Sequence, residues 1–128
     1  MKKLFTILAM VLMVLMAVPA MAATTATAEL SWNAPTTNTD GTPLTDLAGY
    51  KVYMSTSATG TYTLIGTATT TGYIDTVTVP NNTKIVRYYV VTAIDTSGNE
   101  SVYSNQANKS FFGVDTIAPA AANSLTVK

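Results

Sequence analysis

The chain has 128 residues, of which 11% are charged, with seven basic and seven acidic side chains and neither cysteine nor histidine. This length suits one domain or at most two small ones. The missing residue types exclude a disulfide framework, thiolate or imidazole metal ligation, a cysteine nucleophile and any histidine-dependent triad. The balanced charge argues against a nucleic-acid partner, because phosphate binding requires a dense patch of lysine and arginine.

Residues 1–22 have the three parts of a secretory signal peptide. Two lysines open the segment, an uncharged apolar run of 15 residues occupies positions 4–18, and small residues follow up to Ala22. At about 1.5 Å per residue such a run spans roughly 22 Å, which is shorter than the ~30 Å hydrocarbon core of a membrane. We therefore expect cleavage after Ala22, export to the extracellular space or the cell surface, and no membrane span in the mature chain.

The mature chain has the composition and pattern of a β protein. Threonine accounts for 23 of its 106 residues, and threonine, valine, isoleucine and tyrosine all favour strands. Apolar residues alternate with polar ones at period two, and no stretch shows a 3.6-residue period. The predicted strands are residues 28–32, 50–54, 62–68, 73–79, 85–95 and 102–108. Six short strands separated by turns predict an all-β, antiparallel β-sandwich.

Three segments, which follow one another along the chain, make this prediction more specific. They are LSWNAP at residues 30–35, GYKVY at residues 49–53 and YVVTAIDTSGNES at residues 89–101. Together they resemble a bacterial secreted fibronectin type III (immunoglobulin-like) domain over about residues 26–109. The resemblance implies that the six strands are B, C, C′, E, F and G. The core positions are then Leu30, Trp32, Tyr50, Val52, Tyr89, Val91 and Ala93.

Two features depart from the family pattern. The tyrosine that the family usually carries in strand F falls at Arg87 in this sequence, with Tyr88 and Tyr89 just after it. Either this tyrosine is absent, or the register of the comparison is off by one residue. Strand A is missing, because after cleavage only residues 23–27 precede the first predicted strand, too few for a strand and a turn. Without strand A, the first strand has an unpaired edge, which promotes association unless something covers it.

A strand-like segment follows the last predicted strand. Residues 115–119 and 123–128 resemble an inter-domain linker and the strand A of a following domain. We therefore divide the chain into a signal peptide (1–22), a fibronectin type III-like domain (23–110), and a linker with a candidate donor strand (111–128). The candidate interface residues are Phe111, Phe112, Ile117, Leu125 and Val127.

Three arrangements are open for this segment. It can enter the vacant strand A position of the next molecule, a form of β-augmentation that builds fibres. It can fold back into its own domain, which requires residues 109–118 to cover roughly 33 Å. It can also be a frayed tail, or the chain can be a fragment of a longer multidomain protein. We favour exchange between molecules, because it needs no return path.

The two adjacent phenylalanines also allow two interpretations. Phe111 and Phe112 cannot both face one core, so one of them is expected to be exposed and to belong to an interface. Alternatively, both close the bottom of the domain.

No group of residues predicts catalysis, a cofactor or a metal site. No acidic residue is placed against an apolar pocket, and residues 95–99 fit a turn better than a calcium loop. We expect a non-catalytic structural subunit of a filament or surface polymer that associates with copies of itself, and with surface proteins or polysaccharide as further partners. The alternative is a monomeric adhesion module that binds protein or carbohydrate through its loops or through Tyr53, Tyr62 and Tyr103, which are expected to face outward.

Overall fold

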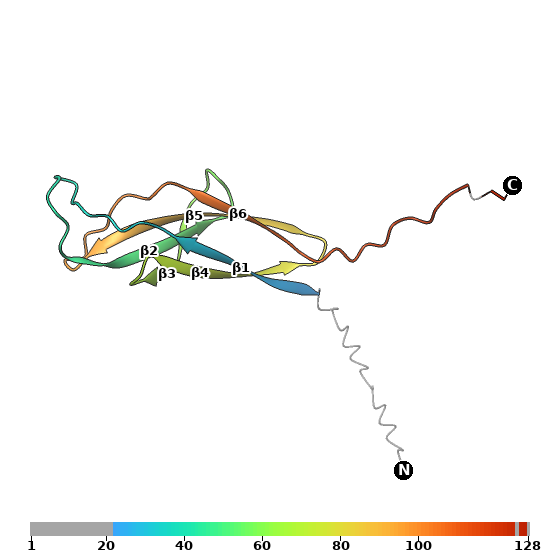
Figure 1. Ribbon diagram of the computed structural model, residues 1–128, viewed down its shortest axis with the longest axis horizontal. Coiled ribbons are helices and arrows are strands. Elements are labelled where there is room, and N and C mark those ends of the chain that lie inside the picture. Colours follow the sequence, from blue (N-terminus) through green and yellow to red (C-terminus); the bar gives the residue numbers. More distant parts are fainter. Residues whose placement is uncertain (1–21, 125, 128) are drawn as a thin grey trace, which may run out of the picture.

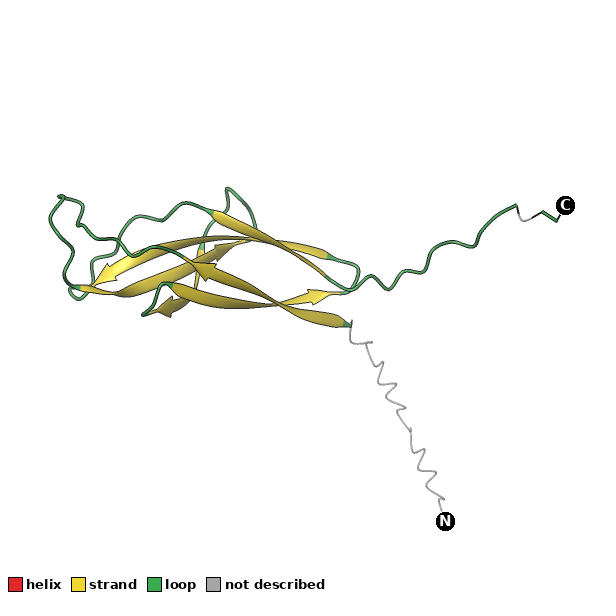
Figure 2. Ribbon diagram, in the orientation of Figure 1, coloured by secondary structure: helices red, strands yellow, loops and turns green. Residues whose placement is uncertain are grey.

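The computed structural model describes residues 22–124, 126 and 127, and it confirms the all-β antiparallel class. Its strands are β1 (Ala23–Ser31), β2 (Leu47–Ser55), β3 (Thr63–Ala68), β4 (Gly72–Pro80), β5 (Lys84–Asp95) and β6 (Ala107–Phe112), as Figures 1 and 2 show. They form a two-stranded sheet, β1-β4, and a four-stranded sheet, β3-β2-β5-β6. The two sheets pack together in a way consistent with a β-sandwich. Within the described residues, no helix is long and apolar enough to cross a membrane.

The core lies between the two sheets and follows from the period-two alternation of the strands. Its buried members come from both sheets and are Ala28, Val77, Val79, Tyr89 and Phe111. Of the predicted core positions, Tyr50, Val52 and Tyr89 are buried, each with at most 4% of its surface exposed. The other predicted core positions are only partly buried, because the two-stranded sheet covers the four-stranded sheet incompletely. These positions are Leu30, Trp32, Val91 and Ala93.

The strand predicted at residues 102–108 is wrong in its position, since β6 begins only at Ala107. The preceding segment, residues 101–106, runs beside β5 without regular pairing. There the Ser101 hydroxyl accepts the Ala93 N–H at 2.9 Å, and the Ser104 hydroxyl accepts the Val91 N–H at 3.0 Å. Because side-chain oxygens take the place of main-chain carbonyls, the regular ladder starts later than the composition suggests.

β6 runs from Ala107 to Phe112, so both phenylalanines lie in a strand and not in a linker. Phe111 has 3% of its surface exposed and belongs to the core, so its assignment to the interface is wrong. Phe112 points to the other face and is 67% exposed, with the Lys84 ammonium 5.5 Å from its ring centroid. Alternation along one strand therefore gives one buried and one exposed ring.

The start of β1 and the end of β6 lie at the same end of the domain. The Asn81 N–H donates to the Ala22 carbonyl, and the Asn82 N–H donates to the Val114 carbonyl, both at 3.0 Å. Both asparagines belong to the β4–β5 turn. From this end, the residues after β6 extend away from the domain (Figure 1). The predicted signal peptide lies outside the described residues except for Ala22.

Candidate functional site

The first part of the candidate site is the open edge of β1. This strand pairs with β4 from Ala23 opposite Pro80 to Ser31 opposite Gly72, and no other strand among the described residues pairs with it. The main-chain groups of successive strand residues point to opposite edges. The Trp32 N–H donates to the Thr71 carbonyl on the β4 side, so the even-numbered residues direct their N–H and C=O groups toward β4. The odd-numbered residues of β1 direct their N–H and C=O groups to the open edge. Such an edge is a template for another strand.

Lys109 crosses this open edge. It lies on the inner face of β6, in register with Arg87 of β5. Its ammonium donates a hydrogen bond of 2.8 Å to the carbonyl oxygen of Thr27 and lies 5.7 Å from the ring centroid of Phe111. The lysine side chain therefore connects the two sheets on the side where β1 has no partner strand.

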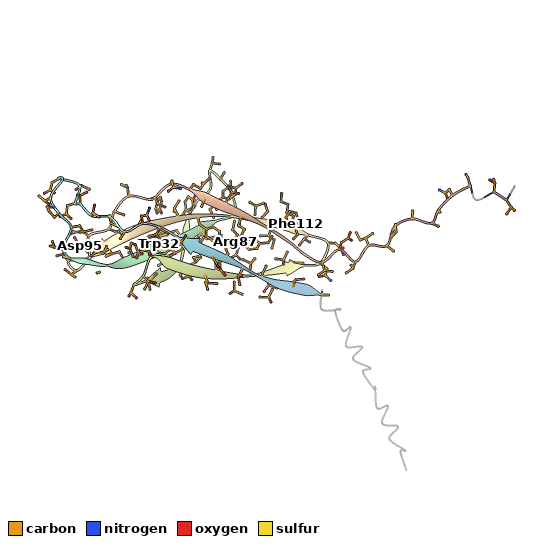
Figure 3. The ribbon with its side chains drawn as sticks, viewed as in Figure 1. Trp32, Arg87, Asp95 and Phe112 are labelled. Atoms are coloured by element: carbon orange, nitrogen blue, oxygen red, sulfur yellow. The ribbon has the colours of Figure 1, made fainter. Side chains whose placement is uncertain are left out.

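A pocket adjoins the end of the open edge. Figure 3 shows Trp32, the residue after β1, toward the end of the domain that carries Asp95, opposite the end with Phe112. The indole lines a pocket of about 200 Å³ together with Pro35, Val91 and Val102.

The same indole carries an unsatisfied donor. Trp32 Nε1 is buried and has no hydrogen-bond partner among the described residues, which for a buried N–H costs about 1–3 kcal/mol. The 88% exposed side chain of Val102 lies at the same pocket. Trp32 therefore combines a place at this pocket with an unpaired N–H group.

The second part of the site is the tail that follows β6, and a clamp formed by Asn82 fixes its direction. The Asn82 side-chain amide donates to the Thr116 hydroxyl, and its oxygen accepts the Thr116 N–H, both at 2.8 Å. The Gly113 N–H also donates to the Thr83 carbonyl at 2.9 Å. A Cβ at Gly113 would lie 1.9 Å from the Pro80 carbonyl oxygen, so only glycine allows this close passage.

Beyond the clamp, the tail is extended and exposes apolar side chains. Ile117 is 72% exposed and Val127 is 96% exposed, whereas Leu125 lies outside the described residues. Phe112, at the end from which the tail departs, is a further exposed apolar side chain. Exposed apolar side chains on an extended segment are suited to binding at a strand edge.

We expect Asn82→Gly to release the tail from its fixed direction while the turn survives. Asn82 has a φ of 59°, which glycine adopts without strain, so the substitution removes only the side-chain hydrogen bonds. Amide hydrogen exchange at Thr116 should then be faster by about 10-fold, as expected for the loss of one protecting hydrogen bond. Unchanged exchange at Thr116 would show that Asn82 does not hold the tail.

An ion pair joins the two sheets, between Asp75 of β4 and Arg87 of β5. Arg87 Nη1 donates to Asp75 Oδ2 at 2.6 Å, and the Tyr89 hydroxyl donates to the same oxygen at 2.7 Å. Asp75 is 8% exposed, and burial together with this hydrogen bond raises the pKa of Tyr89. The network ties β4 of one sheet to β5 of the other.

The three tyrosines expected to face outward lie together on the outer face of the four-stranded sheet. The Tyr103 ring is 5.3 Å from Tyr53 and 5.4 Å from Tyr62, at interplanar angles of 65° and 53°. The Tyr62 hydroxyl also accepts a hydrogen bond from Gln106. Because the rings are tilted against one another, they pack edge against face and do not form a flat stacking platform.

Glu100 fastens the segment after β5 to this outer face. Hydrogen bonds from Lys51 (2.6 Å), Tyr53 and Thr92 (2.7 Å) lower the pKa of the carboxyl group to about 2. The ionised form therefore stabilises the fold fully above the ordinary pKa of 4.5, and this contribution is lost as the pH falls toward 2.

We expect the gap in stability between the unaltered protein and Glu100→Gln to be constant above about pH 5 and to shrink steadily below it. Urea midpoints measured across this range test the expectation. A gap that stays constant into acid would show that the Glu100 carboxylate is not held by these donors.

The acidic side chain of Asp95 accepts hydrogen bonds from the main chain of its own turn. Asp95 Oδ1 accepts the N–H groups of Ser97 at 2.9 Å and Asn99 at 2.8 Å, and Gly98 has a φ of +87°, as predicted for a turn. Among the described residues, no three acidic side chains are grouped so that they could hold a metal ion.

Comparisons of the chain with protein-family models, curated proteins and solved structures found no match. The fold therefore defines the class of this protein. It is an all-β antiparallel domain of about 105 ordered residues.

Proposed function

We propose that the mature chain is a non-catalytic, secreted structural subunit that assembles head to tail by donating its C-terminal strand to the next molecule. The observation that carries this proposal is that one chain presents both an open strand edge, on β1, and an exposed, extended apolar tail. In such β-augmentation, main-chain hydrogen bonds supply affinity and alternate side chains supply specificity.

The directions of β1 and the tail favour exchange between molecules. β1 runs away from the end of the domain at which the tail departs (Figure 1). A tail that arrives from another molecule at the Ser31 end runs antiparallel to β1. To pair in this way with its own β1, the tail must first travel back along a nine-residue strand, about 30 Å, before it can turn. The Asn82 clamp directs it away from that path.

The sheet arrangement supports the likeness to a fibronectin type III domain that lacks its first strand. In immunoglobulin-like sandwiches, strands B and E share one sheet, and strands C, F and G share the other. With β1 as B and β4 as E, the lettering fits the sheets β1-β4 and β3-β2-β5-β6. Strand A then belongs beside β1, at its open edge.

The expected affinity makes assembly dependent on concentration. Burial of Leu125 and Val127 contributes about 1.5–3 kcal/mol for each side chain. A dissociation constant of 1 µM corresponds to about 8 kcal/mol, so further contacts must contribute to a durable polymer. Phe112 and Ile117, at the end where the next molecule would lie, are available for this. Because the contact joins two different surfaces, it builds an open chain of subunits.

Trp32, the single tryptophan of the chain, provides the test, since it lies beside the open edge. We expect purified residues 23–128 to form larger species as concentration rises, seen by sedimentation velocity and negative-stain microscopy. The Trp32 emission should shift in parallel, because an arriving strand changes the surroundings of the indole. A chain that stays monomeric with unchanged emission at all concentrations would contradict the proposal.

A further inference from the structure

We propose that Lys109 occupies the acceptor edge of the free subunit and must be displaced when a second copy donates residues 115–128. This inference rests on the proposed function and adds that the acceptor edge is restrained from binding a donated strand. Lys109 then sets how readily a subunit accepts a strand, without being needed for the fold of the domain.

The position of the ammonium carries the inference. A paired strand lies about 4.7–4.9 Å from its neighbour in the plane of the sheet. The Lys109 Nζ stands 2.8 Å from the Thr27 carbonyl oxygen, in the middle of the open edge. An incoming strand cannot use this stretch of β1 while the lysine side chain lies across it.

The surroundings of Lys109 explain why it reaches for a main-chain carbonyl. Its neighbour in register on β5 is Arg87, and like charges directly opposite each other repel. Asp75 pairs with Arg87 at 2.6 Å, and the described part of the chain gives Lys109 no acidic partner. The Thr27 oxygen and the Phe111 ring remain as its partners.

These contacts are weak enough to be exchanged. The Lys109 residue is exposed, so its ammonium can return to water on a flexible stem when a strand arrives. Lysine at a strand edge is also a common means of preventing uncontrolled pairing. Loss of one exposed hydrogen bond changes an equilibrium by about 2- to 10-fold, which is the size of restraint we expect from Lys109.

A peptide titration tests the inference on the full mature chain. Leu125→Asn and Val127→Asn are introduced together, so that the chain accepts a strand but does not donate one. A synthetic peptide of residues 115–128 is then added, and Trp32 emission reports binding. The peptide carries one aspartate and one lysine, so its net charge does not favour or oppose a lysine on the acceptor.

Lys109→Met removes the ammonium and keeps a similar stem. We expect this variant to bind the peptide about 2- to 10-fold more tightly than its parent. Lys84→Met is the matched control, because Lys84 also lies over a phenylalanine of β6 but on the outer face. It should bind like the parent.

The outcomes separate the two proposals. If neither the parent nor Lys109→Met binds the peptide, strand donation itself is wrong. If the parent binds but Lys109→Met binds equally or more weakly, only the role of Lys109 is wrong. Should Lys109→Met fail to fold, as judged by circular dichroism, Lys109→Gln is subject to the same expectation and the same contradiction.

Discussion

Joint replacement of Leu125 and Val127 by asparagine is expected to keep the mature chain monomeric at concentrations at which the unaltered protein forms polymers. The two apolar side chains together contribute about 3–6 kcal/mol on burial. Their loss, with two amide groups placed against an apolar surface, should raise the concentration needed for assembly by at least about 100-fold. Sedimentation velocity over a dilution series measures this change.

The matched control is the joint replacement of Ser124 and Thr126 by asparagine. These residues alternate with the apolar pair and face the opposite side of a strand. We expect this variant to assemble like the unaltered protein. If the two double variants behave alike, the alternation of the tail has no role and the segment does not act as a donated strand.

Asp75→Ala should cause the largest loss of stability of any single substitution considered for this domain. It leaves the Arg87 guanidinium without its partner between the sheets, where the two side chains are only 11% and 22% exposed. Breaking a buried ion pair by removing one partner costs about 3–5 kcal/mol, and we expect a value near the lower end because Arg87 keeps some contact with water. Urea unfolding, measured in the chain that carries Leu125→Asn and Val127→Asn and is expected to be monomeric, gives the difference in the free energy of unfolding.

Two further variants make this prediction specific. Asp75→Asn should cost less, because the amide oxygen still accepts a hydrogen bond from Tyr89. Asp75→Ala combined with Arg87→Met should also cost less than Asp75→Ala alone, since no unpaired charge remains. A double variant that is less stable than Asp75→Ala would show that the guanidinium is satisfied without the aspartate.

Most of the strands could be predicted because their signal is local. Alternation of Tyr50 and Val52 with polar neighbours marks an inner face wherever a sheet forms, and β2 follows that pattern. The last strand was misplaced because the serine hydroxyls of residues 101 and 104 replace main-chain acceptors beside β5. Composition does not reveal such a substitution, and the error carried over to Phe111, whose burial depends on the register of β6.

The contacts that define the candidate site join residues far apart in the sequence. Asn82 contacts Thr116 across 34 positions, and Lys109 reaches Thr27 across 82. Each residue has an ordinary local explanation, a turn for the asparagine and a solvated charge for the lysine. Only the topology, which places the β4–β5 turn beside the tail and the Lys109 side chain at β1, brings these residues together.

Cysteine cross-linking tests strand donation most directly, since the chain contains no cysteine of its own. Thr25, Thr27 and Glu29, on the outer face of β1, are each replaced by cysteine in one tagged chain, and Thr126 in a chain with a different tag. Residues opposite each other in paired strands have Cα atoms about 4.5–5.5 Å apart, which suits a disulfide.

Strand donation predicts that at least one of the three mixtures forms a disulfide that joins the two tags, and that the same pair placed in one chain gives a ladder of linked subunits. The position that reacts also gives the register of the pairing. A pair that closes only within one chain, or the absence of any link in all three mixtures, would contradict assembly through the β1 edge.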